Sequence, residues 1–169
     1  MFRQPITALA SLVLVSACAS AQKPSTAGQM DILSAQDTLE VCLNRASDAD
    51  RSDQLTCIGE YSQACMTHRP DGETTQGMVR CSIEELEAWD VVLNASYIGL
   101  RQRHEGTMAA DALRDAQRAW ITFRDADCLA ERAVFEGGTI AQIIHASCQM
   151  DHTARRALVL RGRLADLPT

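Results

Sequence analysis

Apolar residues recur every three or four positions through much of the second half of the chain. Between residues 81 and 104 these positions are Leu86, Trp89, Leu93, Tyr97 and Leu100. Such spacing places them along one side of an α-helix with 3.6 residues per turn. The pattern predicts a long amphipathic helix from about Thr75 to His104, which ends before the Glu105–Gly106 pair.

The same spacing continues in the next two segments. From about Ala109 to Phe135 it runs through Leu113, Ala116, Trp120, Phe123 and Asp127. In the last segment it runs through Ile140, Ile143, Ile144, Met150, Ala154, Ala157 and Leu164. Gly137 and Gly138 are predicted to end one helix, and Thr139 to cap the next. Three such helices predict a small bundle, with Trp89 and Trp120 in its core.

The first half of the chain carries a weaker helical pattern. A helix is predicted from Asp31 to Ala46, and a second from Ser52 or Asp53 to about His68. The stretch "RPDGETTQG" is a clear turn signal before the long helix. No run of alternating apolar residues suggests a sheet. We therefore expect an all-α fold, a disulfide-stapled bundle of about five helices in consecutive hairpins.

The N-terminus has the features of an export signal. Arg3 precedes an apolar stretch, residues 6–15, that is too short to span a bilayer permanently. The sequence "VSAC" indicates a lipobox in which Cys18 is lipidated, whereas "ASA" favours a cut after Ala21. The expected organisation is a signal peptide (1–17), a tether (18–30), a helical hairpin (31–74) and a helical domain (75–169). The mature protein is expected in the periplasm, either soluble or held at the outer membrane by acyl chains.

Six cysteines remain once Cys18 is removed or lipidated, and an even number in an exported chain indicates disulfides. Residues equidistant from the turn of a helical hairpin lie side by side. The positions therefore predict three sequential pairs, Cys42–Cys57, Cys65–Cys81 and Cys128–Cys148. Free thiols or a crossed pattern remain the alternatives.

Metal is the rival use for these cysteines. The sequence has no C-x-x-C or H-E-x-x-H motif, although His145 and Cys148 would stand one helical turn apart. We expect no metal and no cofactor, because thiols in an oxidising compartment pair with each other first.

Three motif blocks carry a family resemblance. They are "C…E…WD..LN..Y..L", "AQRAWI.FRDA.C", and "GGT" followed by a cysteine and "T..R...L". About half of the chain thereby resembles the LprI-like lysozyme-inhibitor family of bacterial envelope proteins. The polar and aromatic motif positions are Trp89, Asp90, Asn94, Tyr97, Gln117, Arg118, Trp120, Arg124 and Asp125.

These motif residues have two interpretations. Asp90 and Asn94 share a helix face, as i,i+4 neighbours do, and Arg124 and Asp125 adjoin Trp120. They form either a paired-carboxylate or arginine–carboxylate site, or inter-helix contacts that fix the register of the bundle. The second interpretation is favoured, because helix-borne arginine–aspartate pairs are usually structural. No catalytic residue is assigned, since nucleophile-elbow and phosphate-loop motifs are absent.

The resemblance implies a protein that binds lysozyme and occludes its cleft. Removing the leader takes away Arg3 and no acidic residue, which changes the formal net charge from −6 to −7. This charge disfavours nucleic acid and suits a basic partner, and lysozymes are commonly basic. The candidate contacts lie in turns, at Asp71 and Glu73 and at Glu136 and Thr139, with "HEGT" as a third turn. The alternatives are a structural or adaptor envelope lipoprotein and, third, a hydrolase. The sequence does not indicate the oligomeric state.

Overall fold

The computed structural model describes residues 33–47 and 51–168, and within these ranges it is all-α with no strand. This confirms the predicted fold class. The elements are α1 (Ala35–Ser47), α2 (Arg51–Gln54), the 3-10 helix η1 (Leu55–Cys57), α3 (Glu60–His68), α4 (Thr75–Arg103), α5 (Met108–Ala133) and α6 (Ile140–Ala165).

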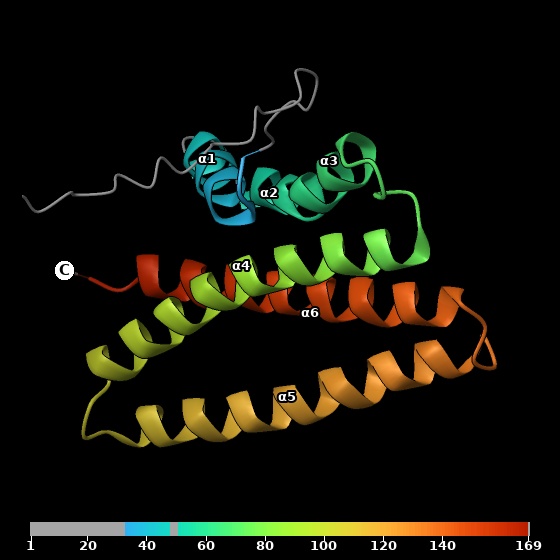
Figure 1. The fold of residues 1–169 in the computed structure, drawn as a ribbon. Coiled ribbons are helices and arrows are strands. Elements are labelled where there is room, and N and C mark those ends of the chain that lie inside the picture. Colours follow the sequence, from blue (N-terminus) through green and yellow to red (C-terminus); the bar gives the residue numbers. More distant parts are fainter. Residues whose placement is uncertain (1–32, 48–50, 169) are drawn as a thin grey trace, which may run out of the picture.

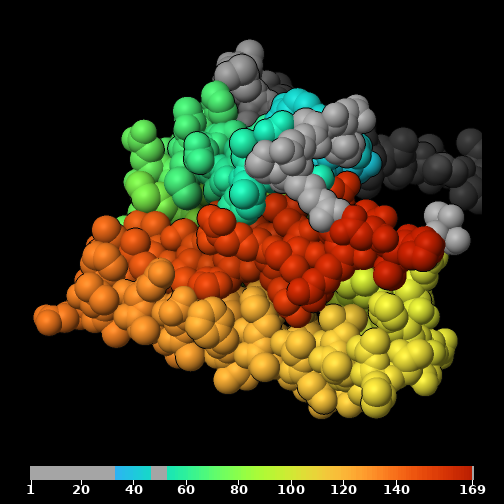
Figure 2. Space-filling model, turned by 180° about the vertical axis from the view of Figure 1, so that it is seen from behind, coloured from blue at the N-terminus to red at the C-terminus, as the bar shows by residue number. Residues whose placement is uncertain are grey.

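Helices α4 and α6 lie side by side in the middle of the molecule and run in the same direction (Figure 1). The segment α1–α3 covers one side of this pair, and α5 lies antiparallel to α6 on the other side. Figure 2 shows the reverse face, where α6 runs between the α1–α3 segment and α5. Helix α6 is therefore the element against which both α4 and α5 pack.

The core forms where small residues of α6 meet large residues of α4. Trp89 is fully buried, and it belongs to the same apolar cluster as Ala154 and Ala157, which are also fully buried. Small side chains let the helix axes approach closely and leave room for the indole ring. Leu93, Leu100 and Leu160 extend this cluster along the pair of helices.

Three disulfides connect neighbouring helical segments. Cys42–Cys57 joins α1 to η1, Cys65–Cys81 joins α3 to α4, and Cys128–Cys148 joins α5 to α6, with Cα–Cα distances of 5.8, 5.7 and 5.6 Å. These are the three sequential pairs that the hairpin geometry predicts. Each closes a short loop, for which the loop-entropy estimate is about 3 kcal/mol.

The predicted second helix is divided. Gly59 has φ +89°, a left-handed conformation that interrupts a helix, so α3 begins only at Glu60. The prediction of one continuous helix from Ser52 or Asp53 to His68 is therefore wrong. Thr139 also differs from prediction, because its side chain makes no capping hydrogen bond to α6.

Helix α5 is less buried than its apolar pattern suggests. Its buried residues are Ala110, Gln117 and Cys128. Trp120, predicted to lie in the core, is half-buried, and Phe123 is 56% exposed. Only the side of α5 that faces α6 is covered, and the remaining apolar residues stay in contact with solvent.

None of the helices within the described ranges combines the length and apolar character that crossing a bilayer requires.

Candidate functional site

A groove lies between α4 and α5. Both helices pack on α6 and diverge from each other, which leaves a hollow of about 580 Å³ between them. Most of the polar motif residues face this hollow. Its lining includes Asp90, Asn94, Tyr97, Gln117, Arg118, Trp120 and Arg124. The structure therefore brings together side chains from two of the three motif blocks.

Trp120, which lines this groove, lies against two arginines, Arg124 of the groove lining and Arg156 of α6. The guanidinium carbons of Arg124 and Arg156 lie 5.1 and 5.8 Å from the centre of the indole ring, within cation–π range. Arg124 also bonds the hydroxyl of Thr153 on α6 at 3.2 Å, and Arg156 donates to the side-chain oxygen of Gln117 at 3.0 Å. These contacts join α5 to α6.

The two aspartates of the motif, Asp125 and Asp90, have different surroundings. Asp125 accepts two hydrogen bonds from its neighbour Arg124, at 3.0 and 2.9 Å. Burial raises the pKa of the Asp90 carboxyl, an effect that the charge of Arg124 opposes and that of Glu87 reinforces. Asp90 is thus a half-buried carboxyl that faces Arg124 across the groove.

Two arginines of the groove were not among the predicted site residues. Arg101 and Arg114 line it beside the motif. The helical spacing carried a signal for Arg101, because Asp90, Asn94, Tyr97 and Arg101 follow one another at intervals of four, three and four residues. Arg114 is held by Asp111 at 2.8 Å and Asp115 at 3.3 Å. Arg101 places Nη1 at 3.4 Å from the hydroxyl of Tyr97.

The α3–α4 turn carries Asp71 and Glu73. Asp71 accepts two hydrogen bonds from Arg80, at 2.8 and 2.7 Å, and these lower the pKa of its carboxyl. Glu73 is exposed and makes no hydrogen bond or ion pair with the described residues. The turn therefore presents one fixed and one unpaired carboxylate.

A second ion pair braces this turn. Arg69 donates to Glu84 at 2.8 Å, and the hydroxyl of Tyr61 donates to the same carboxylate. Burial tends to raise the pKa of Glu84, but the hydrogen bonds from Arg69 and Tyr61 outweigh it, and the pKa is lowered. Burial, together with the hydrogen bond to Glu84, raises the pKa of Tyr61 to about 12. Together with Cys65–Cys81, these contacts hold α3 against α4.

The α5–α6 turn carries Glu136 and Thr139, and both side chains are exposed. Glu136 has φ +47° and is followed by Gly137 at φ +80°, so the backbone turns sharply there. In Figure 1 this turn lies at the same end of the molecule as the α3–α4 turn. The α4–α5 turn, with His104 and Thr107, lies at the opposite end. The turns with Asp71 and Glu73 and with Glu136 and Thr139 thus lie at one end of the protein, whereas the third predicted turn lies at the other.

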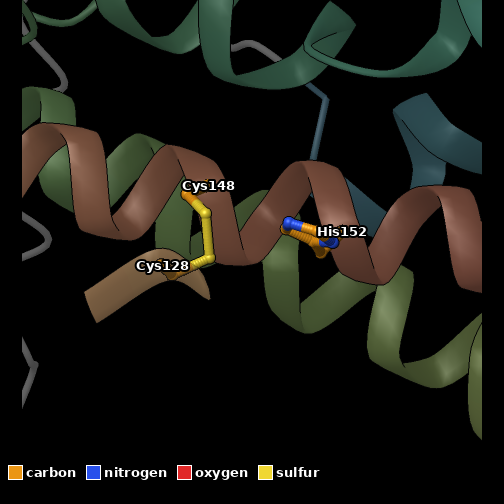
Figure 3. Close-up of side chains that lie close together, drawn as sticks. All are labelled: Cys128, Cys148 and His152. Atoms are coloured by element: carbon orange, nitrogen blue, oxygen red, sulfur yellow. A yellow bond between two sulfur atoms is a disulfide. The ribbon is translucent and has the colours of Figure 1, made fainter. Parts of the chain in front are cut away.

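A cluster of potential metal ligands lies beside the last disulfide. Figure 3 shows Cys128 and Cys148 bonded to each other, with His152 one turn further along α6. Disulfide sulfurs lack the thiolate charge that zinc requires, and Nε2 of His152 lies 2.9 Å from a carboxylate oxygen of Asp127. His145, also on α6, has Nδ1 at 3.3 Å from the backbone oxygen of Cys128. His145 and Cys148 therefore do not form the ligand pair that the sequence suggested.

The chain matches a known protein family. The model of a family described as "Lysozyme inhibitor LprI" matches residues 65–160, more than half of the chain. The matched range begins at Cys65 in α3 and ends at Leu160 in α6. It therefore contains the Cys65–Cys81 and Cys128–Cys148 bridges and the groove. No curated protein and no solved structure matched the chain.

Proposed function

The chain belongs to the LprI lysozyme-inhibitor family, and we propose that it is an exported binding protein that inhibits a lysozyme by occluding its cleft. The match over residues 65–160 is the observation that carries the proposal, because it spans the α3–α6 unit with two of its disulfides. The inhibitor acts by steric and electrostatic fit and needs no catalytic group of its own.

The end formed by the α3–α4 and α5–α6 turns is the proposed contact surface. A protein that fills a cleft needs a protrusion whose shape is already fixed, because ordering a loop on binding costs affinity. Both turns lie between helices that a disulfide holds together. The end also presents Glu73 and Glu136, exposed carboxylates that suit a basic enzyme.

The arginines near the α3–α4 turn are already paired with other carboxylates. Arg80 is paired with Asp71, and Arg69 is paired with Glu84, so neither arginine offsets Glu73. A basic enzyme that approaches this end therefore meets the unpaired carboxylate of Glu73. Electrostatic complementarity of this kind raises the rate of association and is weakened by salt.

The proposal is tested by the lysis of wall suspensions with a basic lysozyme, with and without the purified mature protein. Inhibition is expected, and lysis that is not slowed at a large excess of protein refutes the proposal. The double variant Glu73→Gln/Glu136→Gln is expected to raise the half-inhibitory concentration roughly threefold to tenfold, as for two exposed charge pairs. The control is Glu40→Gln/Glu105→Gln, which removes the same charge from α1 and from the α4–α5 turn at the opposite end. Its half-inhibitory concentration is expected to change little.

Export and anchoring belong to the same proposal. The signal peptide, the lipidation at Cys18 and the tether lie outside the described residues. Intact-mass measurement of the mature protein, reduced and unreduced, identifies the cleavage site, any acyl group and the number of disulfides. A capture experiment, with the mature protein as bait in envelope extract, distinguishes the inhibitor from the main alternative, an adaptor lipoprotein. The adaptor would enrich another envelope component and no lysozyme.

A further inference from the structure

The groove between α4 and α5 is longer than the motif alone suggests. A second hollow, of about 680 Å³, adjoins the first and shares Tyr97 and Arg101 with it. It continues past Gln102 to Thr107 and Asp111 at the α4–α5 turn. We call the two hollows together the α4–α5 groove. Such an elongated hollow suits a ligand that is a chain.

The groove concentrates arginines in a protein whose formal net charge is −6. Arg118 is exposed, and within the described ranges no carboxylate pairs with its guanidinium. Arg101 has no carboxylate partner there either, and its Nε is shielded from solvent without a hydrogen-bond acceptor. Shielded donors without acceptors are costly in a folded protein. Arg101 therefore has an unmet donor at Nε, and the Arg118 guanidinium is exposed beside it in the groove lining, without a carboxylate partner among the described residues.

The remaining lining mixes apolar side chains with amides and aromatic rings; the apolar residues are Leu93, Ile98, Met108, Ala110 and Ile121. The amides of Asn94 and Gln102 and the rings of Tyr97 and Trp120 face the two hollows. A peptide helix would need a continuous apolar stripe, whereas the apolar residues of this groove are interspersed with arginines, amides and carboxylates. Polyanions such as nucleic acid are disfavoured by the acidic residues at its rim, Glu105 and Asp111. A mostly uncharged chain with isolated acid groups fits this lining better.

We propose that the α4–α5 groove binds an oligosaccharide that carries carboxylate groups. The guanidinium of Arg118 takes a carboxylate through paired N–H donors, and Arg101 supports it from the facing helix. The amide of Asn94 both donates and accepts, which suits sugar hydroxyls and N-acetyl groups. The Tyr97 ring offers an apolar face with a polar tip, against which a sugar ring packs.

This site is separate from the contact surface proposed for lysozyme. The groove runs along α4 and α5, whereas Glu73 and Glu136 lie in turns at one end of the molecule. A protein with both surfaces would hold the carboxylated wall glycan while it meets the enzyme that degrades it. The two activities can be measured independently, because a glycan titration contains no enzyme.

The test is calorimetric titration of the mature protein with three probes. The first is an N-acetylated oligosaccharide with lactyl carboxylates and no peptide, the second a neutral N-acetylglucosamine oligomer of the same length, and the third an oligoglutamate peptide. The carboxylated sugar is expected to bind at least about tenfold more tightly than either other probe, the increment of one charge-assisted hydrogen bond. Equal affinity for the neutral sugar or the peptide, or no saturable binding at millimolar concentration, overturns the proposal.

Arginine variants locate the binding site. Arg118→Gln is expected to weaken binding of the carboxylated sugar at least about tenfold, and Arg118→Lys, which keeps the charge but loses the fork, by an intermediate factor. Arg132→Gln is the matched control, because it removes the same charge from an exposed position near the other end of α5. An equal loss in Arg118→Gln and Arg132→Gln would show a general charge effect and overturn the assignment to the groove.

Discussion

The indole Nε1 of Trp89 donates a hydrogen bond to Oε1 of Glu85, one turn earlier on α4, at 3.1 Å, and both side chains are buried. The same carboxylate accepts the backbone N–H groups of Gly59 at 2.6 Å and Ser62 at 2.7 Å. These N–H groups belong to the N-terminus of α3, where a negative charge is favoured. Glu85 therefore ties α3 to α4 and fixes the orientation of the central tryptophan.

Replacing Glu85 tests this connection. Glu85→Gln removes the charge and turns an amide NH₂ toward backbone donors, so we expect a loss of about 2–4 kcal/mol in the free energy of unfolding. Glu87→Gln changes an exposed residue of the same helix, and a change within about 0.5 kcal/mol is expected. Urea denaturation followed by circular dichroism measures both. Equal stabilities of the two variants would contradict the role of Glu85.

The Cys128–Cys148 bridge is the covalent connection between α5 and α6. Helix α5 buries few residues, so this bridge should contribute much of what holds it in place. Cys128→Ser/Cys148→Ser is expected to lower the free energy of unfolding by about 3 kcal/mol, from the loop that the bridge closes. Cys42→Ser/Cys57→Ser, which opens a loop of similar length, provides the comparison. A denaturation midpoint unchanged in the Cys128 variant would show that packing alone holds α5.

The sequence predicted the helices, their turns and the disulfide pairs because each depends on local spacing. The division at Gly59 was missed, since a single glycine within a helical pattern is often tolerated, and the conformation at Gly59 depends on its contact with Glu85. The exposure of Phe123 was missed because periodicity identifies an apolar face but not the element that covers it. Here the Phe123 ring meets His152 of α6 edge-on, with 5.6 Å between the ring centres, and more than half of Phe123 remains exposed.

Part of the candidate site could also be predicted from the sequence. Asp90, Asn94 and Tyr97 were identified from the family motif, and they do line the groove. The sequence does not show that Arg101 of α4 and Arg118 of α5 line the same groove, because this depends on the angle between the two helices. Both helices lie against α6, and this third element sets the angle.

We predict that the folded protein loses stability at alkaline pH because of Tyr61. Its pKa is raised to about 12 in the folded protein from an ordinary value of 10.0, because of burial and the hydrogen bond to Glu84. Between pH 10.0 and about 12 the unfolded chain releases the Tyr61 proton and the folded protein keeps it. The contribution of Tyr61 to the free energy of unfolding is therefore fully present below pH 10.0 and is lost as the pH rises toward about 12.

The chain contains two tyrosines, Tyr61 and Tyr97, which makes the measurement tractable. Titration of tyrosinate absorbance in Tyr97→Phe should show the remaining tyrosine ionising near pH 12. Tyr61→Phe should lose part of the alkaline drop in stability that the unaltered protein shows. Ionisation of Tyr61 near its ordinary pKa in the folded protein would contradict the contact with Glu84.

Gly72 fixes the shape of the α3–α4 turn, which forms part of the contact surface proposed for lysozyme. A Cβ at Gly72 would lie 2.2 Å from the backbone oxygen of Met66, so Gly72→Ala must displace the backbone of the turn. We expect a loss of about 1–3 kcal/mol in stability and weaker inhibition of lysozyme, because Asp71 and Glu73 flank the displaced residue. Gly138→Ala is the control in the neighbouring turn, where a Cβ would meet Phe135 oxygen at a milder 3.3 Å. Unchanged inhibition by a destabilised Gly72→Ala protein would place the lysozyme contact elsewhere.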